Sequence, residues 1–228
     1  MSASPICLLQ WLKPGEYRET RAALSAFATK VNIEHADVRT KVQAADALQS
    51  WLKNNTGNTQ YCFIGAHGIE EPDAAIGVGA TGNADEYAEW YEVWDWFSQG
   101  DLIGGLWLGA CKSSHAASAF STLLARSKYP AIPHFYGFSD EIYPYPEIEE
   151  ILMKLIELTG TERVVPLYDE LDLLRAAVPG TAIELYYPVS TPLTTPEYVN
   201  VDQMVDKIGM NFRQLLENQA AVGSWRHR

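Results

Sequence analysis

Residues 60–68 read QYCFIGAHG and residues 101–114 read DLIGGLWLGACKSS, and these two stretches decide the fold that the sequence predicts. Each is an apolar run of strand length that ends near one reactive side chain, His67 in the first and Cys111 in the second. The amphipathic segment between them predicts a strand–helix–strand crossover, which makes the two strands parallel and brings their carboxyl ends to one edge. We therefore predict that His67 and Cys111 lie just past the ends of neighbouring buried strands.

Apolar runs alternate with amphipathic stretches on both sides of this pair, a pattern typical of a parallel sheet wrapped by helices. The prediction is a single α/β domain over residues 1–228, with three layers and a mostly parallel six-stranded sheet. Strands are expected at 5–12, 31–38, 60–65, 101–110, 131–139 and 181–189, the second of them nearer an edge. An acidic loop follows Gly68 and leads to a short additional strand at 75–80. Helices are expected at 16–30, 40–54, 85–99, 113–128, 146–158, 163–178 and 201–216.

Two of these helices carry a distinct apolar face. Thr40 is a suitable N-cap for the helix at 40–54, because its hydroxyl can accept a hydrogen bond from the first turn. The apolar stripe that follows it consists of Val42, Ala45, Leu48 and Leu52. In the crossover helix at 85–99, the face that we expect to be buried consists of Tyr87, Trp90, Tyr91, Trp94 and Phe97.

Composition excludes several classes of protein. The chain has 228 residues, 29 of them acidic and 17 basic, for a net charge of −12. Nucleic-acid affinity rests on Lys and Arg, so nucleic acid is not an expected partner. No apolar run is long enough to span a bilayer, and residues 1–5 lack the pattern of a signal peptide. Three cysteines are too few for a disulfide framework, so a reducing cytoplasmic location and free thiols are expected.

The chemistry of the predicted edge is that of a nucleophile and its base. A cysteine reacts as the thiolate, and a helix that starts at Ser113 or Ser114 favours negative charge at Cys111. The pKa of a histidine lies near neutrality, so His67 can take the thiol proton and return it. Gly68 has no side chain, which lets its N–H approach a substrate. Together with the N–H of Cys111 it can form an oxyanion hole.

These residues resemble the caspase-like cysteine peptidases, the superfamily that includes caspases, metacaspases, legumain, clostripain and CHAT domains. The pattern is an apolar strand ending in His-Gly, a spacer, and an apolar strand ending in Ala-Cys, here FIGAHG and LWLGACKSS. The resemblance implies the caspase-like fold with an antiparallel last strand, and a His67–Cys111 dyad that cleaves peptide bonds of a protein substrate without a cofactor. It also implies regulation by a protein partner, cleavage, calcium or dimerisation. Gly109 stands where caspases have Gln and metacaspases have Asp, and the compact GACKSS block is nearer to CHAT-like or bacterial members.

The sequence contains one indication of a preference for basic substrates and one of a preference for acidic substrates. Residues 54–111 contain no Lys or Arg but nine acids, namely Glu70, Glu71, Asp73, Asp85, Glu86, Glu89, Glu92, Asp95 and Asp101. A solvated surface explains most of them, and an attraction for basic substrates is the functional interpretation. Asp140 and Glu141 follow the fifth strand at the same edge, where the resemblance implies the pocket for the residue before the cleaved bond, so we hypothesise a preference for Arg or Lys. Arg18 lies near where caspases place an arginine that holds a substrate Asp.

Other interpretations of the same residues stay open. Cys7 and Cys62 lie inside predicted strands, so we expect them to be small buried apolar residues. Cys62, His67, Cys111 and His115 together would supply four zinc-type ligands, although Cys62 should sit well below the edge. A catalytically inactive scaffold or regulatory subunit of the same fold is a further alternative, and a flavodoxin-like signalling domain is a more distant one.

Overall fold

The structure is a computed structural model, and it describes residues 6–13, 16, 33–55, 61–72, 74–81, 86–98, 104–127, 130–142, 154, 167–177, 180, 182–190 and 195–222. The predicted helices at 16–30 and 146–158 fall outside these residues, except for Glu16, which lies in a turn, and Lys154, which is helical. Arg18 also falls outside them.

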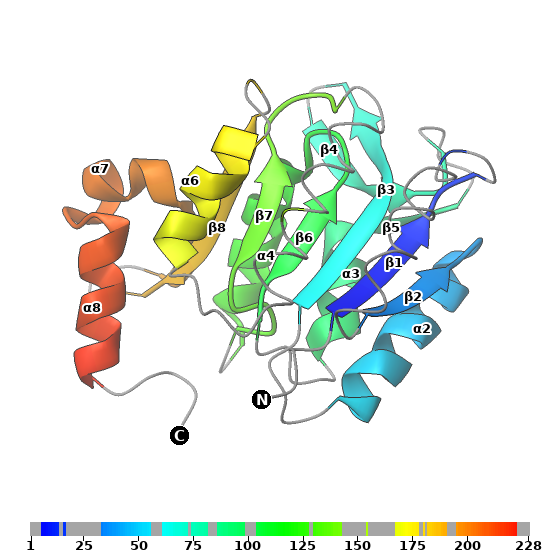
Figure 1. Ribbon diagram of the computed structural model, residues 1–228, viewed down its shortest axis with the longest axis horizontal. Coiled ribbons are helices and arrows are strands. Elements are labelled where there is room, and N and C mark those ends of the chain that lie inside the picture. The colour runs from blue at the N-terminus through cyan, green and yellow to red at the C-terminus, as the bar shows by residue number, and fades with distance from the viewer. Residues whose placement is uncertain are drawn as a thin grey trace.

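A single twisted sheet organises the described residues (Figure 1). Its strands are β1 (Ile6–Trp11), β2 (Ile33–Asp37), β3 (Tyr61–Glu71), β4 (Ala74–Gly79), β5 (Tyr87–Glu89), β6 (Leu106–Gly109), β7 (Phe135–Phe138), β8 (Ile183–Val189) and β9 (Glu197–Asn200). The main order is β2-β1-β3-β6-β7-β8-β9, and β4 and β5 branch from β3. The strands β2, β1, β3, β6 and β7 are parallel to one another. The strand β8 pairs antiparallel with β7, and β9 pairs antiparallel with β8. The mostly parallel sheet, the edge position of β2 and the antiparallel orientation of β8 are thus confirmed. The predicted number of six strands is wrong, because β4, β5 and β9 bring the sheet of the described residues to nine strands.

Helices cover both faces of this sheet, as predicted (Figure 1). They are α2 (Lys41–Asn54), α3 (Trp90–Ser98), α4 (Ala116–Leu124), α6 (Leu167–Ala177), α7 (Met204–Ile208) and α8 (Phe212–Val222), with the 3₁₀ turns η1 (Ser113–His115) and η2 (Val201–Gln203). The helices α2, α3 and α4 pack against one face, and α6, α7 and α8 contribute to the core on the other. No helix in the described ranges has both the length and the apolar character needed to cross a membrane.

The first strand shows why the sheet has two cores. Every residue of β1 is buried. Ile6 and Leu8 point into the core shared with α6 and α8, whereas Cys7, Leu9 and Trp11 point into the core shared with α2 and α3. A strand that is apolar on both faces belongs in the middle of a parallel sheet, where helices cover both sides. Cys7 pairs with Cys62 of β3, and both side chains are buried, as expected.

Two predicted helix faces need correction. In α2, Thr40 caps the first turn as predicted, with its Oγ1 accepting from the Gln43 N–H. Val42, however, is 64% exposed, because the buried side of this helix consists of Ala44, Leu48, Trp51 and Leu52. A tryptophan at position 51 packs against the core and rotates the helix away from the predicted stripe.

The crossover helix also differs, because its predicted first turn is a strand. Residues 87–89 form β5, in which Ala88 pairs with Val78 of β4, and the helix begins only at Trp90. Tyr91 is 49% exposed, whereas Val93 and Trp96 join Trp90, Trp94 and Phe97 in the core. Pairing with β4 satisfies the backbone hydrogen-bonding groups of residues 87–89 in an extended conformation. The spacing of apolar residues within this segment gives no sign of a partner strand.

The last predicted helix also differs from the prediction. The helix predicted at 201–216 is divided into η2, α7 and α8. Gly209 ends α7 in the left-handed conformation, with φ of 68°, which is the usual backbone geometry of a helix C-cap. The strand β9, which no sequence signal predicted, precedes this segment and pairs with β8.

Candidate active site

The strand that carries His67 is longer than predicted. Tyr61–Ala66 run parallel to β1, and Cys62–Gly65 run parallel to β6. The same strand then continues to Glu71 as one arm of an antiparallel hairpin, in which His67 pairs with Gly79. His67 therefore lies within β3, at the point where the strand leaves the parallel sheet, and not beyond the end of the strand. The acidic loop expected after Gly68 is largely strand, since β4 supplies pairing partners for residues 67–71.

Cys111 lies just after β6, as predicted, in a turn held by two backbone hydrogen bonds. The Lys112 N–H donates to the Asp140 carbonyl at 3.1 Å, and the Ser113 N–H donates to the Ala110 carbonyl at 3.3 Å. Lys112 has φ of 51°, a left-handed conformation that turns the chain sharply after the cysteine. The predicted helix begins as the short η1, and α4 starts only at Ala116, so the helix dipole lies farther from Cys111 than expected.

A buried hydroxyl anchors this turn to the sheet. The Ser113 Oγ donates to the Leu108 carbonyl at 2.7 Å and accepts from the Phe138 N–H at 3.1 Å, so it links β6 to β7. Gly137 of β7 packs directly beneath, where an added Cβ would lie 2.8 Å from the Ser114 nitrogen. The backbone around Cys111 is thus fixed from two neighbouring strands.

Gly68 contacts the backbone of Cys111. A Cβ at position 68 would overlap the Cys111 carbonyl oxygen and lie 3.4 Å from the Cys111 Cβ. The absence of a side chain at this position is therefore required by packing, beyond the substrate access that the sequence suggested. This contact brings the His-Gly block and the Ala-Cys block together at the carboxyl edge of the parallel strands.

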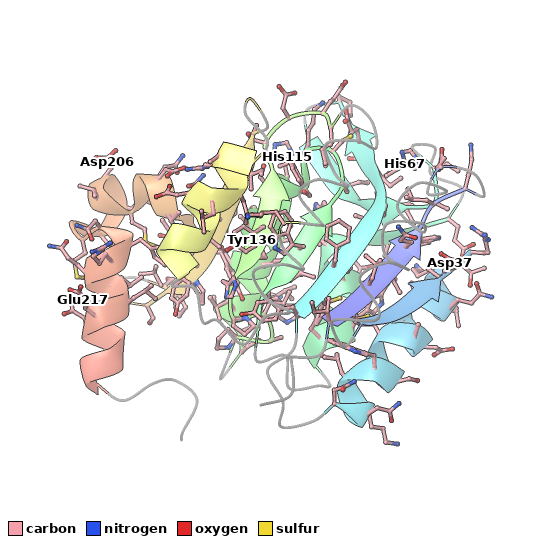
Figure 2. All side chains as sticks on the ribbon, viewed as in Figure 1. Asp37, His67, His115, Tyr136, Asp206 and Glu217 are labelled. Carbon is pink, nitrogen blue, oxygen red and sulfur yellow. The ribbon has the colours of Figure 1, made fainter. Side chains whose placement is uncertain are left out.

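His67 has a partner that sequence reasoning missed. Its Nε2 lies 3.3 Å from the Glu16 Oε2, and the two side chains are 34% and 28% exposed. Glu16 follows β1, whose last residue, Trp11, pairs with Ala66. Glu16 therefore lies beside His67, which Figure 2 labels at the upper right of the molecule. The only available signal was an acidic residue shortly after the first predicted strand.

The Cys111 sulfur contacts the segment that follows β7. The Ile142 N–H donates to the Sγ at 3.4 Å, and the Ile142 carbonyl lies 3.9 Å from it. Asp140 and Glu141, in the same segment, are exposed, and the Glu141 N–H donates to the Asp140 Oδ1 at 2.8 Å. The structure therefore places both predicted substrate-binding residues beside the cysteine turn.

Acidic groups surround the one lysine of this turn. The Lys112 Nζ lies 2.8 Å from the Glu70 Oε2, and this hydrogen bond raises the pKa of Lys112. Glu141 and Asp140 act on the same ammonium through their charges. Because Lys112 is mainly neutralised by Glu70, the carboxylates of Asp140 and Glu141 leave a net negative charge near Cys111.

The four residues of the zinc hypothesis are not gathered at one point. Cys62 is buried beside Cys7, and burial raises the pKa of its thiol. His115 accepts a hydrogen bond at Nδ1 from the Ala75 N–H, at 2.9 Å, and so ties η1 to β4. Within the part of the chain that the structure describes, no three His, Cys, Asp or Glu side chains form a group that could hold a metal ion.

Packing explains why position 109, two residues before the cysteine, is a glycine. An added Cβ there would lie 2.7 Å from the Phe63 ring and 3.3 Å from the Ile64 carbonyl oxygen. Phe63 stacks on Trp107 in the core below. The space that a side chain at position 109 would need is thus occupied by an aromatic ring from β3.

Comparison with known proteins places the fold. No family model and no curated protein matches the sequence. The structure is similar to the X-ray structure of "iotapain", a secreted C11 cysteine protease from Bacteroides thetaiotaomicron, with a TM-score of 0.52 and 12% identity over 82% of this chain and 67% of that chain. A structure of a secreted C11 cysteine protease from the same organism with an irreversible peptide inhibitor has a TM-score of 0.48 and 12% identity, over 81% and 66%. The first likeness confirms the predicted caspase-like fold.

Proposed function

We propose that this chain is a cysteine endopeptidase with Cys111 as nucleophile and His67 as acid and base. The observation that carries the proposal is the contact between Gly68 and the Cys111 backbone, which joins the two sequence blocks at one sheet edge. The fold shared with a C11 cysteine protease supports it. The substrate is a protein, and the chemistry requires no cofactor.

The proposed reaction begins with transfer of the Cys111 thiol proton to His67. The thiolate attacks the carbonyl carbon of a peptide bond, and the N–H groups of Gly68 and Cys111 hold the resulting oxyanion. His67 then gives its proton to the leaving amine as the C–N bond breaks, which leaves an acyl group on the sulfur. Water, deprotonated by His67, attacks this thioester, and the thiolate leaves.

Alkylation of Cys111 tests the dyad directly. Iodoacetamide is expected to label Cys111 in preference to Cys7 and Cys62, which are 2% and 1% exposed. Exposure alone explains that preference, so the informative result is its dependence on His67. His67→Ala should slow labelling at neutral pH by at least about 10-fold, because the thiolate loses its base.

The matched control for this experiment is His115→Ala, since that ring already bonds the Ala75 N–H. We expect the control to label at the wild-type rate, measured by mass spectrometry of the digested protein. Equal labelling of Cys111 in wild type and His67→Ala would favour the alternative, a catalytically inactive scaffold or regulatory subunit.

We also propose that Asp140 gives the site a preference for Arg or Lys before the cleaved bond. The exposed Asp140 lies in the segment that contacts Cys111 and adds to the negative charge there.

Asp140→Asn should lower kcat/KM for Arg and Lys peptides by about 10-fold, corresponding to ~1.4 kcal/mol, and leave kcat/KM for uncharged peptides unchanged. Asp206→Asn, in α7, is the control. Cleavage by the wild type after Asp, but not after Arg or Lys, in a fluorogenic panel would refute the assignment.

We also propose that a partner or another trigger regulates the site and that the protein is cytoplasmic. The two contacts of Ile142 with the Cys111 sulfur are compatible with a resting site that a partner or another trigger opens. A cytoplasmic location agrees with free thiols at Cys7, Cys62 and Cys111.

A further inference from the structure

The turn after β1 holds the carboxylate of Glu16 in a defined place. The Glu16 Oε2 accepts from the Lys13 N–H at 2.8 Å, and the Glu16 N–H donates to the Lys13 carbonyl at 3.1 Å. Both the backbone and the side chain of Glu16 are thereby tied to Lys13. A carboxylate fixed by its own turn does not depend on His67 for its position.

The same oxygen faces the imidazole of His67. Because β1 ends opposite Ala66, the turn that follows it meets the next residue of β3, and the His67 Nε2 lies 3.3 Å from the Glu16 Oε2. The Glu16 Oε2 thus lies within hydrogen-bonding distance of two nitrogens, the backbone nitrogen of Lys13 and the Nε2 of the ring. The remaining polar atom of the ring is Nδ1.

This arrangement determines which ring nitrogen holds the proton. An ionised carboxylate only accepts hydrogen bonds, and a neutral imidazole has a single N–H. Nε2 must therefore carry the hydrogen that Glu16 accepts, and Nδ1 must carry the free lone pair. We infer that Glu16 is a positioning residue that selects this tautomer, so that Nδ1 is the atom that takes the proton of Cys111 and returns it. This inference rests on the proposed function.

Glu16 also affects the charged state of the pair. When the thiol proton moves to Nδ1, the imidazole becomes a cation and its Nε2–H bond to Glu16 becomes charge-assisted on both sides. The carboxylate then favours the thiolate–imidazolium form without touching substrate or sulfur. In a Ser-His-Asp triad, the wrong tautomer costs about 10⁴ in kcat. We expect a smaller effect here, since both side chains are partly exposed and a thiol ionises more readily than a hydroxyl.

Two substitutions of Glu16 in the full chain distinguish its effect on the His67 tautomer from the effect of its charge. Glu16→Gln removes the charge. Because the Lys13 N–H requires an acceptor, the amide oxygen stays at this point and still accepts from the Nε2–H, so kcat should fall by only about 10-fold. Glu16→Ala removes both, so kcat should fall by about 100-fold, with KM within about 3-fold of wild type in each case. Glu92→Gln is the matched control, because Glu92 also accepts from a side-chain nitrogen, that of Lys41, and from the backbone N–H three residues earlier, and it is 26% exposed, close to the 28% of Glu16.

Nitrogen NMR of the imidazole gives a readout that does not require activity. In a Cys111→Ala background, His67 is identified as the signal absent from His67→Ala, and we expect the pure Nε2–H tautomer. Glu16→Ala should produce a mixture of the two tautomers. A signal that Glu16→Ala leaves unchanged, or a loss of activity confined to KM, would overturn the role of Glu16. Failure of the proposed function looks different: no His67-dependent alkylation and no peptide cleavage in the wild type, with the Nε2–H tautomer still present.

Discussion

Replacing Cys111 by alanine is expected to lower kcat for peptide cleavage by at least about 10⁴-fold, as loss of a covalent nucleophile does in other hydrolases. Cys111 is only partly buried, so the free energy of unfolding should change by less than about 1 kcal/mol. The measurement is incubation of each protein with a library of unfolded proteins, followed by sequencing of the new amino termini. Termini that the wild type generates should be absent with Cys111→Ala.

Cys62→Ala is the control, because it should lower stability and leave kcat unchanged. Its side chain is 1% exposed in the core that α2, α3 and α4 cover, so its removal leaves a cavity and should cost about 1–2 kcal/mol of stability. Because Cys62 lies below the edge that carries Cys111, kcat should stay at the wild-type value. New termini that persist with Cys111→Ala would show that the cleavage comes from elsewhere and would contradict the proposed nucleophile.

The second large effect is expected from Gly68→Ala. The added methyl group would overlap the Cys111 carbonyl oxygen. That carbonyl cannot move away easily, because hydrogen bonds to Asp140 and Ala110 fix the turn on both sides. We expect a loss of roughly 2–3 kcal/mol of stability, as overpacking of a rigid site produces. The forced separation of His67 from Cys111 should lower kcat by about 10²-fold or more.

Gly65→Ala, in the same strand, is the matched control for this prediction. Its nearest neighbour would be the Phe63 ring at 3.3 Å, a side chain that can shift by a few tenths of an ångström. Denaturant unfolding and kcat should therefore change much less with Gly65→Ala than with Gly68→Ala. Equal effects of the two substitutions would mean that the contact with Cys111 does not constrain the site.

The parallel core of the fold was predictable because its central strands are largely apolar. Every residue of β1 and β6 is buried, and apart from Gln10 in β1 all of them are apolar, so each strand is recognisable without reference to the rest of the chain. The place of Cys111 follows directly, since polar residues begin at Lys112 where β6 has ended. The crossover between β3 and β6 then brings Gly68 to Cys111, which is a consequence of topology more than of any single contact.

The hairpin that extends β3 was not predictable in the same way. Apart from the buried Ile69, residues 67–71 are polar or small, and they are strand because β4 supplies partners for their backbone groups. Tyr87–Glu89 became β5 for the same reason, although their spacing continues that of the helix behind them. The exposed positions of Val42 and Tyr91 depend on how each helix is rotated against the core, which the tryptophans of α2 and α3 decide.

The fold class and the two blocks that carry the proposed chemistry are readable from the chain alone, because apolar runs and their polar ends are local properties. The surroundings of His67 and Cys111 depend on how distant segments pack together. Glu16 meets His67 because β1 ends opposite Ala66, and Ile142 meets the sulfur because β7 lies beside β6. Strand register sets both contacts, and register arises from pairing between segments distant in sequence.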